Sequence, residues 1–405
     1  MNAKADVDRR TWMPKEKLLK LPPVLRAGFR PFFFLGPLWA IVVVSLWIQA
    51  LAGAIEIPTL FDPLSWHRHE MLFGFLGAVI AGFLMTAIPN WTGRLPIAGA
   101  RLAGLVMMWF AARFAIVFSA SVGAATAMVM EAAFLLTLAG VCAREVLIAR
   151  NRNVPVVGVV LLFAIAAVID HLEVLRVLAT DGLGWRAGFA LILILVTLIG
   201  GRIIPSFTAN WLIKQGQSRL PGQASTFDHV TIGATALALG CWAFQVAASF
   251  TASLLLAAGL LQLARLARWG GWRTAREPLV LILHISYAWL PIGLLLLGLS
   301  IVDVDVPGTA GLHALGAGAM ASMVLAVMTR ATLGHTGREL HANAGTVLIY
   351  SLVTLGAALR VAAAWLPLDY LLAIKIAGAL WGAAFLLFLA LYGPKLLGPR
   401  PDGRP

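Results

Sequence analysis

Charged residues are scarce in this chain. They make up 12% of its 405 residues, roughly half the share that a soluble globular protein carries, while 60% of the residues are hydrophobic. Apolar runs recur along nearly the whole length, and each has the roughly twenty residues that a helix needs to cross a bilayer. The composition therefore excludes an ordinary soluble protein and predicts an all-α polytopic membrane protein.

Acidic residues and cysteines are also few. The chain has 18 Asp and Glu against 31 Lys and Arg, and two cysteines, Cys142 and Cys241. The basic residues fall mainly in short connections between apolar runs, so we expect the lipid bilayer as a partner and no nucleic acid. The cysteines lie in separate apolar runs without metal-type spacing, which predicts packing residues.

About twelve transmembrane helices are predicted, with both termini in the cytoplasm. Alternate connections carry most of the basic residues, as the positive-inside rule requires. The predicted domains are a basic cytoplasmic tail over 1–30, a membrane domain over 31–395 and a short cytoplasmic tail over 396–405. The expected spans are 31–54, 69–90, 98–119, 123–148, 154–178, 185–208, 230–249, 252–269, 277–300, 309–332, 344–365 and 369–393.

Two stretches of the sequence read as copies of each other. Without a gap, His69 aligns with His313, and Thr92-Gly93-Arg94 aligns with Thr336-Gly337-Arg338. Both stretches are long enough to cross a bilayer. Each copy is therefore predicted to place a histidine at the outer face of the membrane and Thr-Gly-Arg at the inner face.

A weaker third copy lies midway between these two. Its Asn210-Trp211 repeats Asn90-Trp91. In a different register, Arg202 aligns with Arg330, and Trp185 stands where the other two copies have His69 and His313. Three equivalent helices predict a pseudo-threefold repeat of four-helix units. The main subunit of haem-copper oxidases has the same plan, but this is an analogy of fold and does not give function.

Ionisable residues inside membrane spans are costly, so each is a candidate for function. Imidazole is the usual ligand of haem iron, copper and zinc. His67 and His69 are two residues apart, and on a regular helix such side chains point about 200° apart. The two histidines therefore do not readily share one metal unless residues 65–68 are extended. The outer candidate metal ligands are His67, His69, His171 and His313.

Two more histidines, His284 and His335, are candidates for a second, inner metal site. Three neighbours are candidates to orient the ligands by hydrogen bonds: Glu70, Asp170 and Tyr287. A lone histidine at the headgroup level is usually a polar surface residue. The match of His69 with His313 in depth and downstream sequence is what favours a metal role.

The inner ends of the three equivalent helices form a predicted polar layer. Arginines suit phosphate, carboxylate or haem propionate, yet stop-transfer charges and helix caps explain them equally well. The layer lies roughly 30 Å from the outer histidines, so one cofactor cannot touch both. Pro205 predicts irregular backbone here. The layer contains Asn90, Trp91, Arg94, Arg202, Asn210, Arg330 and Arg338.

Several long strings resemble the NnrS family. They are WHRHEMLFGF at 66–75, AIPNWTG at 87–93, GRIIPSFT at 201–208, LH at 283–284 with YAW at 287–289, and MTRATLGHTGR at 328–338. The resemblance covers about 26–395. It implies a bacterial inner-membrane protein that contains haem and copper and is linked to nitric oxide metabolism, denitrification and protection against nitrosative stress. It does not assign ligands residue by residue, and Arg68 departs from the small residue common in the family.

The first hypothesis is a haem- and copper-binding membrane protein that binds nitric oxide or turns it over, with a respiratory-chain electron donor as a further partner. One alternative is a transporter, because internal repeats and the in-span Arg202 and Lys375 occur in transporters. Another is a metal or haem trafficking factor for respiratory enzymes. Haem absorption with bound copper favours the first hypothesis, and colourless protein with substrate flux favours a transporter.

Overall fold

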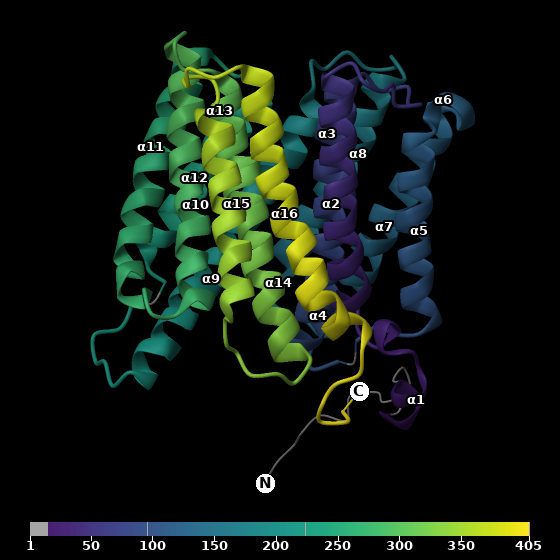
Figure 1. Ribbon diagram of the computed structural model, residues 1–405, viewed down its shortest axis with the longest axis vertical. Helices are drawn as coiled ribbons and strands as arrows, with labels where there is room; N and C mark the ends of the chain where they lie inside the picture. Colours follow the sequence, from purple (N-terminus) through teal and green to yellow (C-terminus); the bar gives the residue numbers. More distant parts are fainter. Residues whose placement is uncertain (1–14, 95, 223, 405) are drawn as a thin grey trace.

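The computed structural model describes residues 15–94, 96–222 and 224–404, and this part of the chain contains helices and no β-strand. Eleven helices in the described part are long and apolar enough to cross a membrane, which confirms the predicted all-α polytopic class. They run side by side as one bundle (Figure 1). They are α2 (Phe29–Leu51), Pro63–Thr92, α5 (Ala100–Val117), α7 (Ala124–Ile148), α8 (Val154–Val174), α9 (Leu183–Lys214), α11 (Ala248–Arg268), α12 (Pro278–Val302), Gly308–His335, α15 (Ala344–Ala362) and α16 (Tyr370–Leu397).

Short helices precede or connect these spans. α1 (Lys15–Lys20) and the 3-10 turn η2 (Pro23–Leu25) come before α2, while α6 (Ser119–Val122) and the 3-10 turn η4 (Gly271–Thr274) lie between spans. The tips labelled α3, α6 and α13 lie at the upper end of the bundle in Figure 1, and α1 lies at the lower end. Cys142 and Cys241 are buried and free, which confirms that they pack within the protein.

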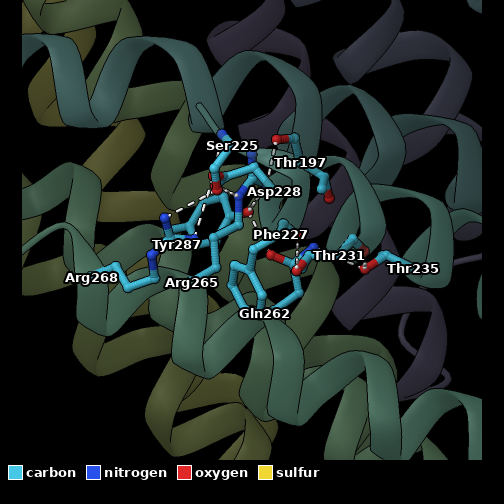
Figure 2. Close-up of polar contacts among 10 residues, drawn as sticks. All are labelled: Thr197, Ser225, Phe227, Asp228, Thr231, Thr235, Gln262, Arg265, Arg268 and Tyr287. Atoms are coloured by element: carbon cyan, nitrogen blue, oxygen red, sulfur yellow. Dashed lines mark hydrogen bonds and ion pairs between the residues drawn. The ribbon is translucent and has the colours of Figure 1, made fainter. Parts of the chain in front are cut away.

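The expected span 230–249 corresponds to α10 (Thr226–Ala243), which is too polar to count among the eleven. Asp228, Thr231 and Thr235 are buried on α10, which packs against α11 and α9 (Figure 2). Asp228 accepts a hydrogen bond from Arg265 (Nε to Oδ1, 2.9 Å), and Thr235 accepts one from Gln262 (Nε2 to Oγ1, 2.8 Å). Part of the low hydropathy of α10 therefore comes from side chains with partners inside the protein, and the prediction of twelve spans remains compatible with it.

Arg265 joins α10 to two further helices. Its Nη1 donates to the carbonyl of Thr197 on α9 (3.1 Å) and to the hydroxyl of Tyr287 on α12 (3.0 Å). Tyr287 in turn donates to Gln262 Oε1 (2.7 Å), as Figure 2 shows. Buried polar groups of this kind are stable only when each has a partner.

Replacing Tyr287 with phenylalanine removes the donor to the buried Gln262. An unsatisfied buried group costs about 1–3 kcal/mol, so we expect the variant to unfold at a lower temperature in detergent. Ser253→Ala is the control, because Ser253 is exposed on α11 and its hydroxyl donates within its own helix. Equal unfolding temperatures for the two variants would contradict this account of the network.

The two strong sequence copies share an unusual backbone feature. The span Pro63–Thr92 consists of α3 (Pro63–His69), the π-helix η3 (Glu70–Leu76) and α4 (Gly77–Thr92). The span Gly308–His335 consists of α13 (Gly308–His313), the π-helix η5 (Ala314–Met320) and α14 (Ala321–His335). Both π-helices begin directly after the aligned histidines and have the same length, so the ungapped register of the repeat is confirmed in the backbone.

A side chain donates to the same carbonyl in each π-helix. Trp109 Nε1 donates to the carbonyl of Gly74 (3.0 Å), and Ser322 Oγ donates to that of Gly318 (2.5 Å). A π-helix disturbs the regular ladder of backbone hydrogen bonds and is frequent at functional sites. The widened turns are thus supported by side chains in both copies.

The third copy, α9, lies against both π-helices but is an α-helix throughout. It continues for 32 residues through Pro205, so the expectation of irregular backbone at this proline is wrong. Gly188 allows a close approach to η3, because a Cβ atom there would lie 2.7 Å from the ring of Phe73. The pseudo-threefold repeat stays a prediction, with two copies alike and the third different.

The two ends of the described chain meet. Arg30, at the start of α2, donates to the carbonyls of Leu396 (2.9 Å) and Gly398 (2.7 Å) at the end of α16. Arg400 donates to the carbonyl of His335 at the end of α14 (3.0 Å). Residues 1–14 of the predicted tail lie outside the described residues, and the cytoplasmic placement of both tails remains a prediction.

Candidate metal centre and ligand cavity

Two histidines and a glutamate from three different helices meet in one buried cluster. His69 ends α3, Glu131 lies on α7 and His171 lies on α8, and all three are fully buried. Glu131 Oε2 is 2.7 Å from His69 Nε2 and 2.9 Å from His171 Nε2. One ligand atom from each residue lies within 4.8 Å of the other two, so the group could hold a metal ion. We call these three residues the metal triad.

Further charged side chains surround the metal triad. Asp170 Oδ2 lies 2.7 Å from His69 Nδ1, and Arg113 on α5 pairs with Glu131. Arg113 also donates to Glu70 Oε2 (2.7 Å), which accepts a second hydrogen bond from Trp39 Nε1 (2.5 Å). A carboxylate on the second nitrogen of a histidine fixes its tautomer and its orientation. Asp170 therefore orients His69, and Arg113 compensates the charge of two buried carboxylates.

Aromatic rings enclose the metal triad. The ring of Phe61 lies 4.8 Å from that of His69 and 5.4 Å from that of His171, and Phe73 lies 5.1 Å from His69. His171 Nδ1 is buried without a hydrogen-bond partner among the described residues. Imidazole and carboxylate donors together suit copper, zinc and iron.

A separate cavity of about 290 Å³ opens beside this cluster. It is at the lower end of the roughly 300–1,000 Å³ that is typical of small-molecule sites. His67 and His313 both line it, together with the half-buried arginines Arg68 and Arg360. The aromatic residues of its wall are Trp47, Phe75, Trp185, Phe189 and Trp381.

The two histidines of the cavity have ring nitrogens available for a ligand. His67 stacks on Trp47 (centroids 4.9 Å apart, planes at 16°), and its buried Nδ1 has no partner among the described residues. His313 Nδ1 donates to the carbonyl of Thr309 (2.7 Å). Because Nδ1 carries the proton in that bond, Nε2 of His313 keeps a lone pair for a metal or a ligand.

The chain can also be compared with known proteins. The family model described as NnrS protein matches residues 23–400. This chain belongs to the NnrS family. A comparison with curated proteins found no match. Membership makes the chain a nitric-oxide-related membrane protein.

For this NnrS-family chain the structure divides the four outer histidines into two pairs. His69 and His171 belong to the metal triad, while His67 and His313 face the cavity. α3 is a regular helix over Pro63–His69, so the two histidines at this spacing point to different places, as helix geometry requires. Trp185, which replaces the histidine in the third copy, lines the same cavity as His67 and His313.

The three candidate orienting residues of the NnrS-family chain bind partners on other helices. Asp170 Oδ2 lies 2.7 Å from Nδ1 of the candidate ligand His69. Glu70 binds Trp39 and Arg113, and Tyr287 belongs to the network of Arg265 (Figure 2). An orienting role for Glu70 and Tyr287 stays a prediction.

The two inner histidines lie in different surroundings. His284 Nε2 is 2.8 Å from Thr208 Oγ1, and its buried Nδ1 has no partner among the described residues. His335 is exposed, and its ring lies 5.5 Å from that of Phe29. Within the described residues the metal triad is the group with metal-type geometry, so a second, inner metal site stays a prediction.

Most residues of the predicted polar layer contact a neighbouring residue and not a common site. Its members contact neighbours as follows: Asn90 with the Thr86 carbonyl, Trp91 with Asn151 through its carbonyl, Arg94 with Glu145, Arg202 with Asn153, Arg330 with the Phe207 ring, and Arg338 with the Thr336 carbonyl. Asn210 is exposed. These contacts suit helix ends, and a ligand role for the layer stays a prediction.

Sequence reasoning missed Glu131, the central residue of the metal triad. The signal was present, because Glu131 lies within the apolar span Ala124–Ile148 and a lone carboxylate there is costly. Arg113 and Arg360 could be recognised as basic residues inside spans. Their partners were not foreseeable from the sequence.

Proposed function

We propose that this protein binds haem in the cavity between His67 and His313 and copper at the metal triad, and that it binds or turns over nitric oxide there. It would act in nitric oxide metabolism and nitrosative-stress protection at the bacterial inner membrane, with both termini in the cytoplasm. The observation that carries the proposal is that two histidines with available ring nitrogens line one apolar cavity.

The residues of the cavity fit haem. His67 and His313, which come from the two copies of the repeat and line the cavity, would hold the haem iron through their ring nitrogens. The aromatic wall suits a porphyrin, and Arg68 and Arg360 suit its carboxylates. Arg68 is held in place by Ser65 (2.9 Å) and by the ring of Trp185 (4.7 Å).

The residues of the metal triad fit copper. Two imidazoles and one carboxylate are accepted ligands of copper, and the same set also suits non-haem iron(II). Asp170 would keep the proton on Nδ1 of His69, so that Nε2 points to the metal position. Arg113 would hold Glu131 from its other oxygen.

The chain's own groups would set the conditions for chemistry. Haem iron and copper supply ligand binding and one-electron transfer when they are bound. Phe61 and Phe73 would exclude water from the metal triad, and Trp47 would fix the ring of His67. The buried carboxylates Glu70 and Asp170 are the groups placed to hold a proton near the metal triad.

Optical spectra of the detergent-purified protein test the haem site. We expect a haem absorption band in the wild type that His67→Ala and His313→Ala each reduce strongly or shift. His341→Ala is the control, because His341 is exposed and distant from the cavity wall. Spectra that are unchanged in both cavity variants would refute the haem assignment. Colourless protein with substrate flux in proteoliposomes would instead support a transporter. Metal that is bound only in transit would support a trafficking factor.

Metal analysis tests the triad independently. We expect copper in the wild type and its loss in His171→Ala, with the haem band retained, because His171 is outside the cavity wall. Loss of one ligand from a three-residue site is expected to weaken metal affinity by more than the roughly 10–100-fold that follows the loss of an orienting partner. If the protein instead contains more iron than haem, and His171→Ala loses that extra iron, the metal of the triad is non-haem iron and not copper. Unchanged metal content would refute the site.

A further inference from the structure

A second hollow lies along the inner side of the π-helices. It is an apolar cleft of about 110 Å³ between α4, α9 and α14, the three helices of the predicted repeat. Its lining residues in the described part of the chain are apolar and include Leu76, Ile199, Ile203, Met320 and Met328. We call this volume the apolar cleft.

The packing of α9 explains why the apolar cleft exists. At one end α9 meets both π-helices closely, since Gly188 lies against Phe73 and Gly316 lies against Phe189. At the other end, just beyond the last lining residues, the Arg330 guanidinium lies 4.0 Å from the centre of the Phe207 ring. α9 and the span Gly308–His335 thus touch at both ends of the cleft, and space remains between these contacts.

The apolar cleft adjoins the histidine cavity. Leu76 and Met320 line both volumes, and both side chains are buried. They are also equivalent in the repeat, because Leu76 is the last residue of η3 and Met320 the last residue of η5. Two flexible apolar side chains therefore separate the volumes, and methionine in particular changes shape easily.

The contents of the apolar cleft follow from its chemistry. Apolar cavities of roughly 150 Å³ stay dry and bind xenon or benzene. A polar or charged molecule would lose its hydrogen bonds to water without replacement, since the described lining side chains are apolar. The volume of the apolar cleft is somewhat below that of such a cavity, so small apolar molecules of diatomic-gas size fit in it.

We propose that the apolar cleft binds small apolar molecules of diatomic-gas size and passes them between Leu76 and Met320 into the cavity of His67 and His313. The part of this proposal that concerns delivery to a haem rests on the proposed function. The part that concerns binding in the cleft rests on its volume and lining alone.

Xenon is the probe for binding. Crystals of the full-length protein under xenon pressure are expected to show xenon in the apolar cleft. Ile199→Phe should remove that xenon, because Ile199 is half-buried and faces the cleft from α9. Ile213→Phe is the matched control on the same helix, where the side chain is exposed and outside the lining. No xenon in the wild-type cleft would overturn the proposal.

Carbon monoxide recombination after flash photolysis is the probe for delivery. In haem-containing protein we expect several-fold slower recombination from solution in Ile199→Phe and in Met320→Phe, and an unchanged rate in Ile213→Phe. Rates unchanged in both cleft variants would overturn the passage even if xenon binds. Purified protein without haem would count against the proposed function, and xenon binding would then decide the cleft alone.

Discussion

Replacing Arg113 with methionine is expected to cost about 3–5 kcal/mol of the free energy of unfolding, because it leaves buried carboxylates without their counter-charge. Arg113 is 1% exposed, and its guanidinium pairs with both Glu70 and Glu131, which are fully buried. The measurement is thermal unfolding in detergent. Arg101→Met is the matched control, because Arg101 lies exposed on the same helix, α5.

Two related variants sharpen this test. Arg113→Lys should recover part of the stability, because an ammonium group restores the charge but lacks the fork that reaches two carboxylates at once. Adding Glu70→Gln to Arg113→Met should also recover part, since one of the two uncompensated charges is removed. If Arg113→Met and Arg101→Met unfold at the same temperature, the buried ion pairs do not contribute in this way.

Replacing Gly184 with alanine is expected to destabilise the protein and to lower its metal content. A Cβ atom at Gly184, on α9, would lie 2.3 Å from the backbone nitrogen and 2.6 Å from the Cα atom of Asp170, on α8. Backbone atoms cannot rotate away, so the two helices must separate. Overpacking of this kind costs about 1–3 kcal/mol and sometimes more. The shift also moves Asp170 and His171 away from His69 and Glu131.

The control for Gly184 is Gly158→Ala on α8. No atom lies within 4 Å of a Cβ built at Gly158, so its unfolding temperature and metal content should stay those of the wild type. Metal content by elemental analysis and unfolding temperature are measured on the same preparations. Wild-type values for Gly184→Ala would show that α8 and α9 can separate without disturbing the metal triad.

Much of the fold could be predicted because the order of apolar and polar residues along the chain shows where each membrane-spanning helix lies. The expected spans coincide with helices over nearly their whole lengths, as 123–148 does with Ala124–Ile148. The ungapped alignment of His69 with His313 predicted the register in which two π-helices now appear. Pro205 was misjudged because a long helix held by neighbours on both sides can absorb one missing hydrogen bond.

The candidate site was predicted in its residue types and not in its pairings. Four outer histidines were predicted as metal ligands, without a decision on which of them share a metal, and they occupy two places. His69 contacts Glu131 and Asp170, which are 62 and 101 residues away in the sequence. Such contacts depend on how each helix is rotated about its axis and on which neighbours it meets. Neither quantity is encoded in a local pattern.

The sequence by itself determined the membrane-protein class, the repeat and the NnrS family, since each follows from the order of apolar, charged and motif residues along the chain. The tertiary structure decided that His67 faces a cavity while His69 joins the metal triad, and that Glu131 and Arg113 complete the cluster. The physical reason is packing. A buried charge is stable only beside its partner, and helices distant in the sequence supply that partner once they are packed side by side.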